Sequence, residues 1–141
     1  MPSVVRNILA VVAGFIIGSI VNIAIVSIGP LVIPPPEGVD MTDMDQLAEN
    51  MKLLKPANFI APFLAHALGS LVGAFVVAMI ATKYKMIFAL GIGAFFMLGG
   101  ITMVAMVGGP IWFILLDLIG AYLPMGYLGG VLAGANRPSP E

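Results

Sequence analysis

The chain has 141 residues, of which 60% are hydrophobic and 9% are charged, whereas an ordinary soluble domain has about 25% charged residues. Six Lys and Arg and seven Asp and Glu cannot cover a water-facing surface, which excludes a soluble globular protein. A net charge of -1 with no basic run excludes a nucleic-acid interface. The absence of cysteine excludes disulfides and thiolate metal sites. We therefore expect an all-α polytopic membrane protein with lipid as its solvent.

Four apolar stretches of the chain are long enough to cross a bilayer as helices, which takes about 20 residues. They are residues 7–29, 59–82, 86–107 and 111–135. They predict a four-transmembrane-helix bundle that forms a single membrane domain over residues 1–141. Hydrolase motifs such as GxSxG and HExxH do not occur in the sequence. We therefore expect a protein that is not an enzyme and that carries no metal or cofactor.

The basic residues indicate how this bundle is oriented. Lys52 and Lys55 lie in the loop of residues 30–57, and the other basic residues would share the opposite side of the membrane. These others are Arg6, Lys83, Lys85 and Arg137. The positive-inside rule therefore predicts that both termini are cytoplasmic in a bacterial inner membrane and that the loop faces outward.

The outer loop contains a second pattern, which predicts a short amphipathic helix over residues 43–54. Thr42 is the expected N-cap, with acidic residues in the first turn. One face would carry Met44, Leu47, Met51 and Leu54, as in a helix that lies at the membrane interface. This helix either caps the bundle or serves as a lid or docking surface for a partner.

Two ionisable residues stand out inside the predicted spans. His66 is the only histidine of the chain, and Asp117 is the only acid deep in a span. Both are at matching depth, about 10 Å below the outer interface at 1.5 Å per residue, so we expect them to pair. The pair is either a titratable functional site or a structural hydrogen bond between helices. Asn22, Ser27 and Thr102 are candidate polar neighbours.

Small residues recur every fourth position in three of the spans, which predicts close helix contacts. These helix-packing residues are Gly14, Gly18, Ala65, Gly69, Gly73, Gly126, Gly130 and Gly134. The spacing leaves open whether the contacts lie within one bundle or between subunits. Pro124 lies inside the fourth span and deprives the carbonyl of Gly120 of its hydrogen bond, so a kink is expected there.

Residues 28–41, IGPLVIPPPEGVDM, and residues 63–69, FLAHALG, resemble small uncharacterised four-span bacterial membrane proteins. The resemblance extends over most of the chain and carries no function with it. Small multidrug transporters are similar in size and span number, but their acidic residue lies in the first span. Here Asn22 is the most polar deep residue of that span, which argues against drug–proton antiport.

Two function classes follow from the sequence. The favoured class is a small accessory or scaffold subunit that forms oligomers or joins a larger membrane complex. Small size, the glycine stripes and the scarcity of polar groups support it. The alternative class is a small proton-linked transporter or channel that uses His66 and Asp117. The expected partners are membrane lipid and either a second copy of the chain or a larger membrane complex.

Overall fold

The computed structural model describes residues 1–137, and its regular structure is entirely helical. Four helical stretches are long and apolar enough to cross a membrane, as the sequence predicts. The first is α1, Ser3–Val32. The second is the 3-10 turn η1, Pro56–Phe59, continued by α3, Ile60–Ile80. The third is α4, Lys85–Val107, and the fourth consists of α5, Ile111–Gly120, and α6, Leu123–Leu132.

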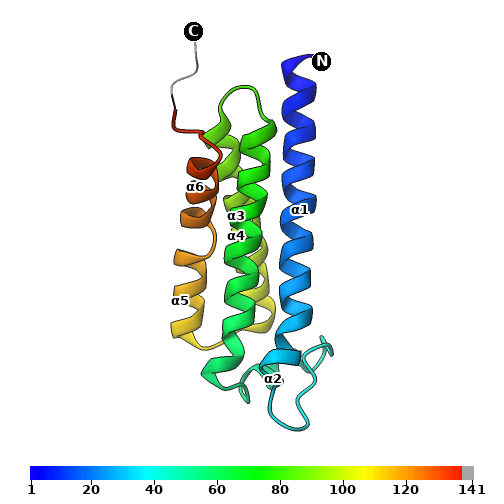
Figure 1. Ribbon diagram of the computed structural model, residues 1–141. Coiled ribbons are helices and arrows are strands. Elements are labelled where there is room, and N and C mark those ends of the chain that lie inside the picture. The colour runs from blue at the N-terminus through cyan, green and yellow to red at the C-terminus, as the bar shows by residue number, and fades with distance from the viewer. Residues whose placement is uncertain (138–141) are drawn as a thin grey trace.

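Helix α3 is the central element of the bundle. It packs against α1 on one side and against α4 and α6 on the other, whereas α1 and α4 hardly touch. Figure 1 shows the N-terminus and the α3–α4 turn at one end of the bundle, here called the terminal end. The loop of residues 33–59 and the α4–α5 turn lie at the opposite end, here called the loop end. The bundle is therefore built on α3, with α1 attached to one of its faces.

The contact between α1 and α3 is made backbone to backbone through glycines. A Cβ atom added to Gly14 would lie 2.7 Å from the carbonyl oxygen of Gly73, and one added to Gly18 would lie 2.7 Å from that of Gly69. Neither distance leaves room for a side chain. Both glycine pairs of the first two spans are therefore used inside one chain, which decides between the two interpretations of these stripes.

Helix α6 uses its own glycines in the same way. A Cβ atom on Gly126 would lie 3.1 Å from the carbonyl oxygen of Ala89, and one on Gly130 would lie 2.8 Å from Met86 Sδ. Gly134 does not continue this stripe, because α6 ends at Leu132 and Gly134 adopts a φ of 76° in the turn that follows. Ala65, on α3, is fully buried.

Two helix boundaries differ from the sequence predictions. Helix α1 continues through Pro30 to Val32 instead of ending at Gly29, because Ile33 N donates to Gly29 O at 2.8 Å and extends the last turn. The loop helix, α2, covers only Leu47–Met51 rather than residues 43–54. Thr42 does not cap it, because the helix begins five residues later, at Leu47, and the Asp45 amide donates to Asp43 Oδ1 instead.

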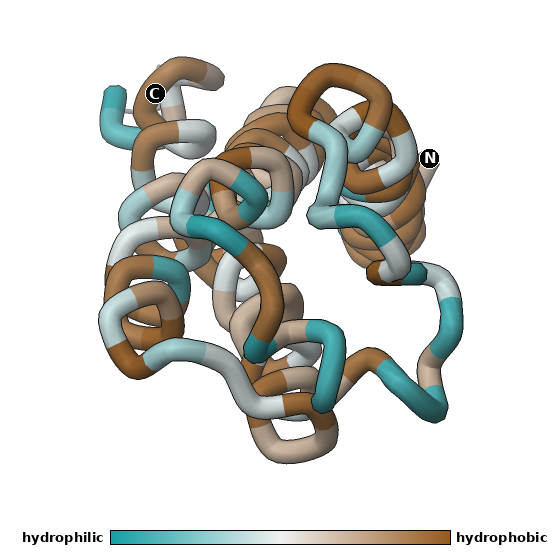
Figure 2. The backbone as a smooth tube through the Cα atoms, turned by 90° about the horizontal axis from the view of Figure 1, so that it is seen from below, coloured by the Kyte–Doolittle hydropathy of each residue, from teal (hydrophilic) through white to brown (hydrophobic). Residues whose placement is uncertain are grey.

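Local hydrogen bonds hold the loop of residues 33–59. The buried Asn50 donates from Nδ2 to Asp40 O at 2.6 Å, and Asn58 donates from Nδ2 to Pro34 O at 3.0 Å. The Thr42 hydroxyl donates to Asp40 and lowers the pKa of that carboxyl below its ordinary value. Figure 2 shows hydrophilic residues along this loop in front of largely hydrophobic helices. The loop is thus a polar layer across one end of an apolar bundle.

We predict that Gly73→Leu destabilises the bundle, because the new side chain would collide with the backbone of α1 at Gly14. Overpacking of this kind costs about 1–3 kcal/mol. Gly99→Leu is the matched control, since a Cβ atom at Gly99 has no neighbour within 4 Å. Thermal unfolding in mild detergent should rank Gly73→Leu well below the wild type and Gly99→Leu close to it. Equal losses in both variants would contradict the close-contact account.

Candidate functional site

The structure brings His66 and Asp117 together across the interface of α3 and α5. His66 Nδ1 lies 2.9 Å from both carboxylate oxygens of Asp117. Each residue stands six positions after the first residue of its helix, about 9 Å along the axis, so the two meet at the same depth. The side chain of Asp117 is 5% exposed and that of His66 is 25% exposed. The histidine therefore connects a buried acid with a more accessible region.

Tyr122 is the third member of the cluster, and the sequence analysis did not assign it there. Its hydroxyl donates to Asp117 Oδ2 at 3.0 Å, and its ring stacks on that of His66 with centroids 5.5 Å apart. The residue is 2% exposed. Its hydroxyl lies against Gly100 of α4, where a Cβ atom would collide with it. Two features of the sequence could have indicated this position: Tyr122 follows Asp117, the only acid deep in a span, by five residues, and the neighbouring span contains Gly100.

The fourth span is interrupted beside this cluster. Helix α5 closes with Ala121 N donating to Asp117 O at 2.9 Å, and α6 opens with Gly126 N donating to Tyr122 O at 2.7 Å. Pro124 stands in the first turn of α6 and has no N–H for the carbonyl of Gly120. The expected kink is thus a break at Ala121 and Tyr122. This break turns the Tyr122 ring back toward Asp117.

The other polar residues proposed from the sequence lie elsewhere or at the margin. Ser27 is exposed, and Thr102 is exposed and donates to Leu98 O of its own helix at 2.8 Å. Asn22 is half-buried, and its Cβ lies 3.1 Å from the position a Cβ would take on Gly69, about one turn along α3 from His66. The cluster therefore consists of His66, Asp117 and Tyr122, with Asn22 as the nearest of the three candidates.

Ser70 is a further polar side chain in this part of α3. It is one helical turn beyond His66, and it is fully buried. Its Oγ has no hydrogen-bond partner among the described residues. Since buried hydroxyl groups normally have a partner or an ordered water, Ser70 leaves an unused donor one turn from the histidine.

The cluster has a simple proton chemistry. Asp117 accepts hydrogen bonds from Tyr122 and, in the tautomer protonated at Nδ1, from His66. In that tautomer the second ring nitrogen, Nε2, is an acceptor that can take one proton. With Asp117 ionised and His66 neutral, the cluster carries one negative charge.

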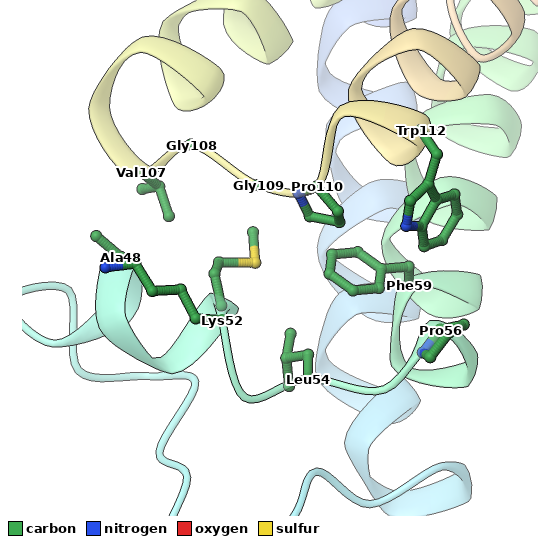
Figure 3. A pocket seen from close by; sticks show the side chains of 11 residues that line it. Ala48, Lys52, Leu54, Pro56, Phe59, Val107, Gly108, Gly109, Pro110 and Trp112 are labelled. Atoms are coloured by element: carbon green, nitrogen blue, oxygen red, sulfur yellow. The ribbon is translucent and has the colours of Figure 1, made fainter.

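A cavity at one end of the bundle is separate from this cluster. It measures about 410 Å³ and lies at the loop end, between α2, η1 and the α4–α5 turn. Figure 3 shows Phe59, Pro110 and Trp112 on one side of it and Ala48 with Lys52 on the other. Trp112 packs edge-on against Phe59 with ring centroids 5.5 Å apart. The cavity thus lies between the polar loop and the ends of the helices.

Comparison with protein-family models, with curated proteins and with solved structures finds no match to the chain. Within residues 1–137, no group of three His, Asp or Glu side chains is placed to hold a metal ion. A function therefore has to be inferred from the geometry of the His66–Asp117–Tyr122 cluster.

We predict that Tyr122→Phe destabilises the bundle by about 1.5–3 kcal/mol, the usual value of a hydrogen bond to a charged group. The ring and its stacking on His66 are retained, so the loss isolates the hydroxyl. In a double-mutant cycle with Asp117→Ala, which removes the acceptor, the two changes should be strongly non-additive, because each removes the same contact. Additive losses in thermal unfolding would contradict a shared hydrogen bond. Tyr127→Phe, at an exposed position of α6, is the matched control.

Proposed function

We propose that the chain is a small proton-linked transporter or channel of the bacterial cytoplasmic membrane, with both termini in the cytoplasm. The observation that carries this proposal is the buried carboxylate of Asp117, which is hydrogen-bonded by His66 and Tyr122 next to a broken helix. Ionisable groups within a membrane span are expensive and are usually functional. Interrupted spans at polar sites are a recurring feature of transporters.

Two structural features favour this function over the accessory subunit that the sequence favoured. The first is that the glycine pairs of α1 and α3 contact each other, so they are not available as a surface for oligomerisation. The second is that the few polar groups of the spans are gathered, because Tyr122 joins His66 and Asp117 in one network. The scarcity of polar groups in the spans is therefore a weaker argument against a transport function than it was when each polar residue was considered alone.

The orientation is supported by the separation of charge between the two ends. Arg6, Lys83 and Lys85 lie at the terminal end, with Arg137 following α6, whereas the loop end carries two basic residues, Lys52 and Lys55. Under the positive-inside rule the terminal end is cytoplasmic. In this orientation His66 and Asp117 lie closer to the outer face.

Cysteine labelling tests this orientation, and the chain has no native cysteine that would react. Gln46 and Tyr84 are exposed and lie at opposite ends of the bundle. We predict that Gln46→Cys reacts with an impermeant thiol reagent added to intact cells and that Tyr84→Cys reacts only after permeabilisation. The reverse pattern would overturn the orientation, and equal labelling of both variants in intact cells would overturn the membrane placement.

Proton flux tests the function. Purified protein in liposomes with an internal pH dye should acidify the lumen when a potassium diffusion potential, inside negative, is imposed. We predict that Asp117→Asn reduces this flux to that of empty liposomes, because the amide keeps the shape but cannot carry the charge. Asp45→Asn, an exposed change in the outer loop, should retain full flux. Equal flux in the wild type and Asp117→Asn would overturn the proposal.

An exposed face of α1 is the structural feature that bears on the second function class, an accessory subunit. Helix α1 packs almost only on α3, and its opposite face is apolar and exposed, including Ile8, Ile20 and Ile23. A partner span could cover this face in place of lipid. Native mass spectrometry after mild extraction would favour this class if the chain travels with a stoichiometric partner while Asp117→Asn folds normally and changes no flux.

A further inference from the structure

A groove runs along the bundle between α1 and α4 in the half nearest the terminal end. Its volume is about 380 Å³, and its lining is entirely apolar: Val11 and Phe15 on α1, and Ile87, Phe88, Gly91, Ile92 and Phe95 on α4. It exists because both helices pack on α3 and hardly touch each other. Two of the lining rings, Phe15 and Phe95, pack edge-on with centroids 5.3 Å apart.

Basic residues surround the open end of this groove. Lys85 is the first residue of α4, two positions before Ile87, which lines the groove. Lys83 lies in the turn before α4. No carboxylate of residues 1–137 lies within ion-pair distance of these side chains. The groove therefore has an apolar interior and an unneutralised cationic mouth.

Hydrogen bonds fix this mouth in place. Asn7 Oδ1 accepts from Thr82 N at 3.0 Å and from Thr82 Oγ1 at 3.2 Å, which ties α1 to the α3–α4 turn. Arg6 donates from Nε to Ile80 O at 2.7 Å, at the C-terminal end of α3. This contact uses one of the five N–H groups of the guanidinium. The turn that carries Lys83 and leads into Lys85 is therefore held beside α1.

We propose that this groove binds one anionic phospholipid, with an acyl chain between α1 and α4 and the phosphate at Lys83 and Lys85. The inference rests on the proposed membrane placement and is independent of proton transport. Basic pockets between spans on the cytoplasmic side are suited to anionic headgroups. The groove extends from Ile87 to Phe95, about 12 Å, which suits part of an acyl chain. A partner span would need a groove along the full bilayer thickness of about 30 Å.

Two glycines of α4 provide a matched pair of variants. Gly91 lines the groove and Gly99 does not, and a Cβ atom at either position has no neighbour within 4 Å. Leucine at either position is therefore compatible with the fold, but only Gly91→Leu fills the groove. A second pair of variants separates charge from position: Lys83→Gln with Lys85→Gln at the mouth, and Lys52→Gln with Lys55→Gln at the loop end.

The experiment is native mass spectrometry of the detergent-purified full chain titrated with phosphatidylglycerol or phosphatidylcholine of identical acyl chains. We expect one phosphatidylglycerol per chain, bound in clear preference to phosphatidylcholine. Replacing Lys83 and Lys85 by Gln should weaken the affinity for phosphatidylglycerol about fivefold per lysine. The affinity for phosphatidylcholine should not change. Gly91→Leu should abolish the specific adduct, whereas Gly99→Leu and the loop-end variants should retain it.

Three results would overturn the proposal. They are equal retention of both lipids by the wild type, equal loss in Gly91→Leu and Gly99→Leu, and an unchanged preference after removal of Lys83 and Lys85. Each would mean that the lipid covers the bundle nonspecifically. Failure of the membrane placement is distinguished by cysteine labelling at Gln46 and Tyr84, and failure of the transport function by the flux of Asp117→Asn. Neither of those measurements depends on lipid preference.

Discussion

A carboxylate buried among apolar helices has to find its hydrogen-bond donors within the chain, because the surroundings provide none. Asp117 finds them in His66, on another span, and in Tyr122, just beyond the end of its own helix. The second donor requires a break in the fourth span, which turns the Tyr122 ring back toward the acid. It also requires Gly100 on α4, where any side chain would collide with the Tyr122 hydroxyl. One buried charge thus fixes the relation of α3, α4, α5 and α6.

The close approach of α1 and α3 meets a different requirement. Between apolar helices in lipid, burial of apolar surface gives little net attraction, so contact area and close packing have to stabilise association. Glycine facing glycine brings the two backbones together at Gly14 with Gly73 and at Gly18 with Gly69. The contact of α1 with α4 is instead made by side chains, with Phe15 packed on Phe95 and Phe96. The groove between α1 and α4 is the consequence of that one-sided packing.

The two ends of the molecule differ in chemistry, and the two proposed sites follow this difference. The proton-binding cluster lies in the half nearest the acidic loop, whereas the lipid groove opens among the basic residues of the terminal end. His66, Asp117 and Tyr122 are not among the residues that line the groove. The proposed lipid binding and the proposed proton transfer can therefore be tested by separate substitutions, Gly91→Leu for the first and Asp117→Asn for the second.

The sequence by itself determined the four apolar helices, since span length and composition are properties of each segment alone. Helix depth also predicted the meeting of His66 with Asp117, because equal distances from the same end place two residues at one level. The loop helix was predicted too long, since Thr42 forms a turn with Asp40 and Asp45 N donates to Asp43 Oδ1, so that the helix begins only at Leu47. Only the tertiary structure decided which glycines face one another, the joining of Tyr122 to the cluster and the groove between α1 and α4. Each of these depends on how the helices are rotated and packed, and that depends on contacts among several segments at once.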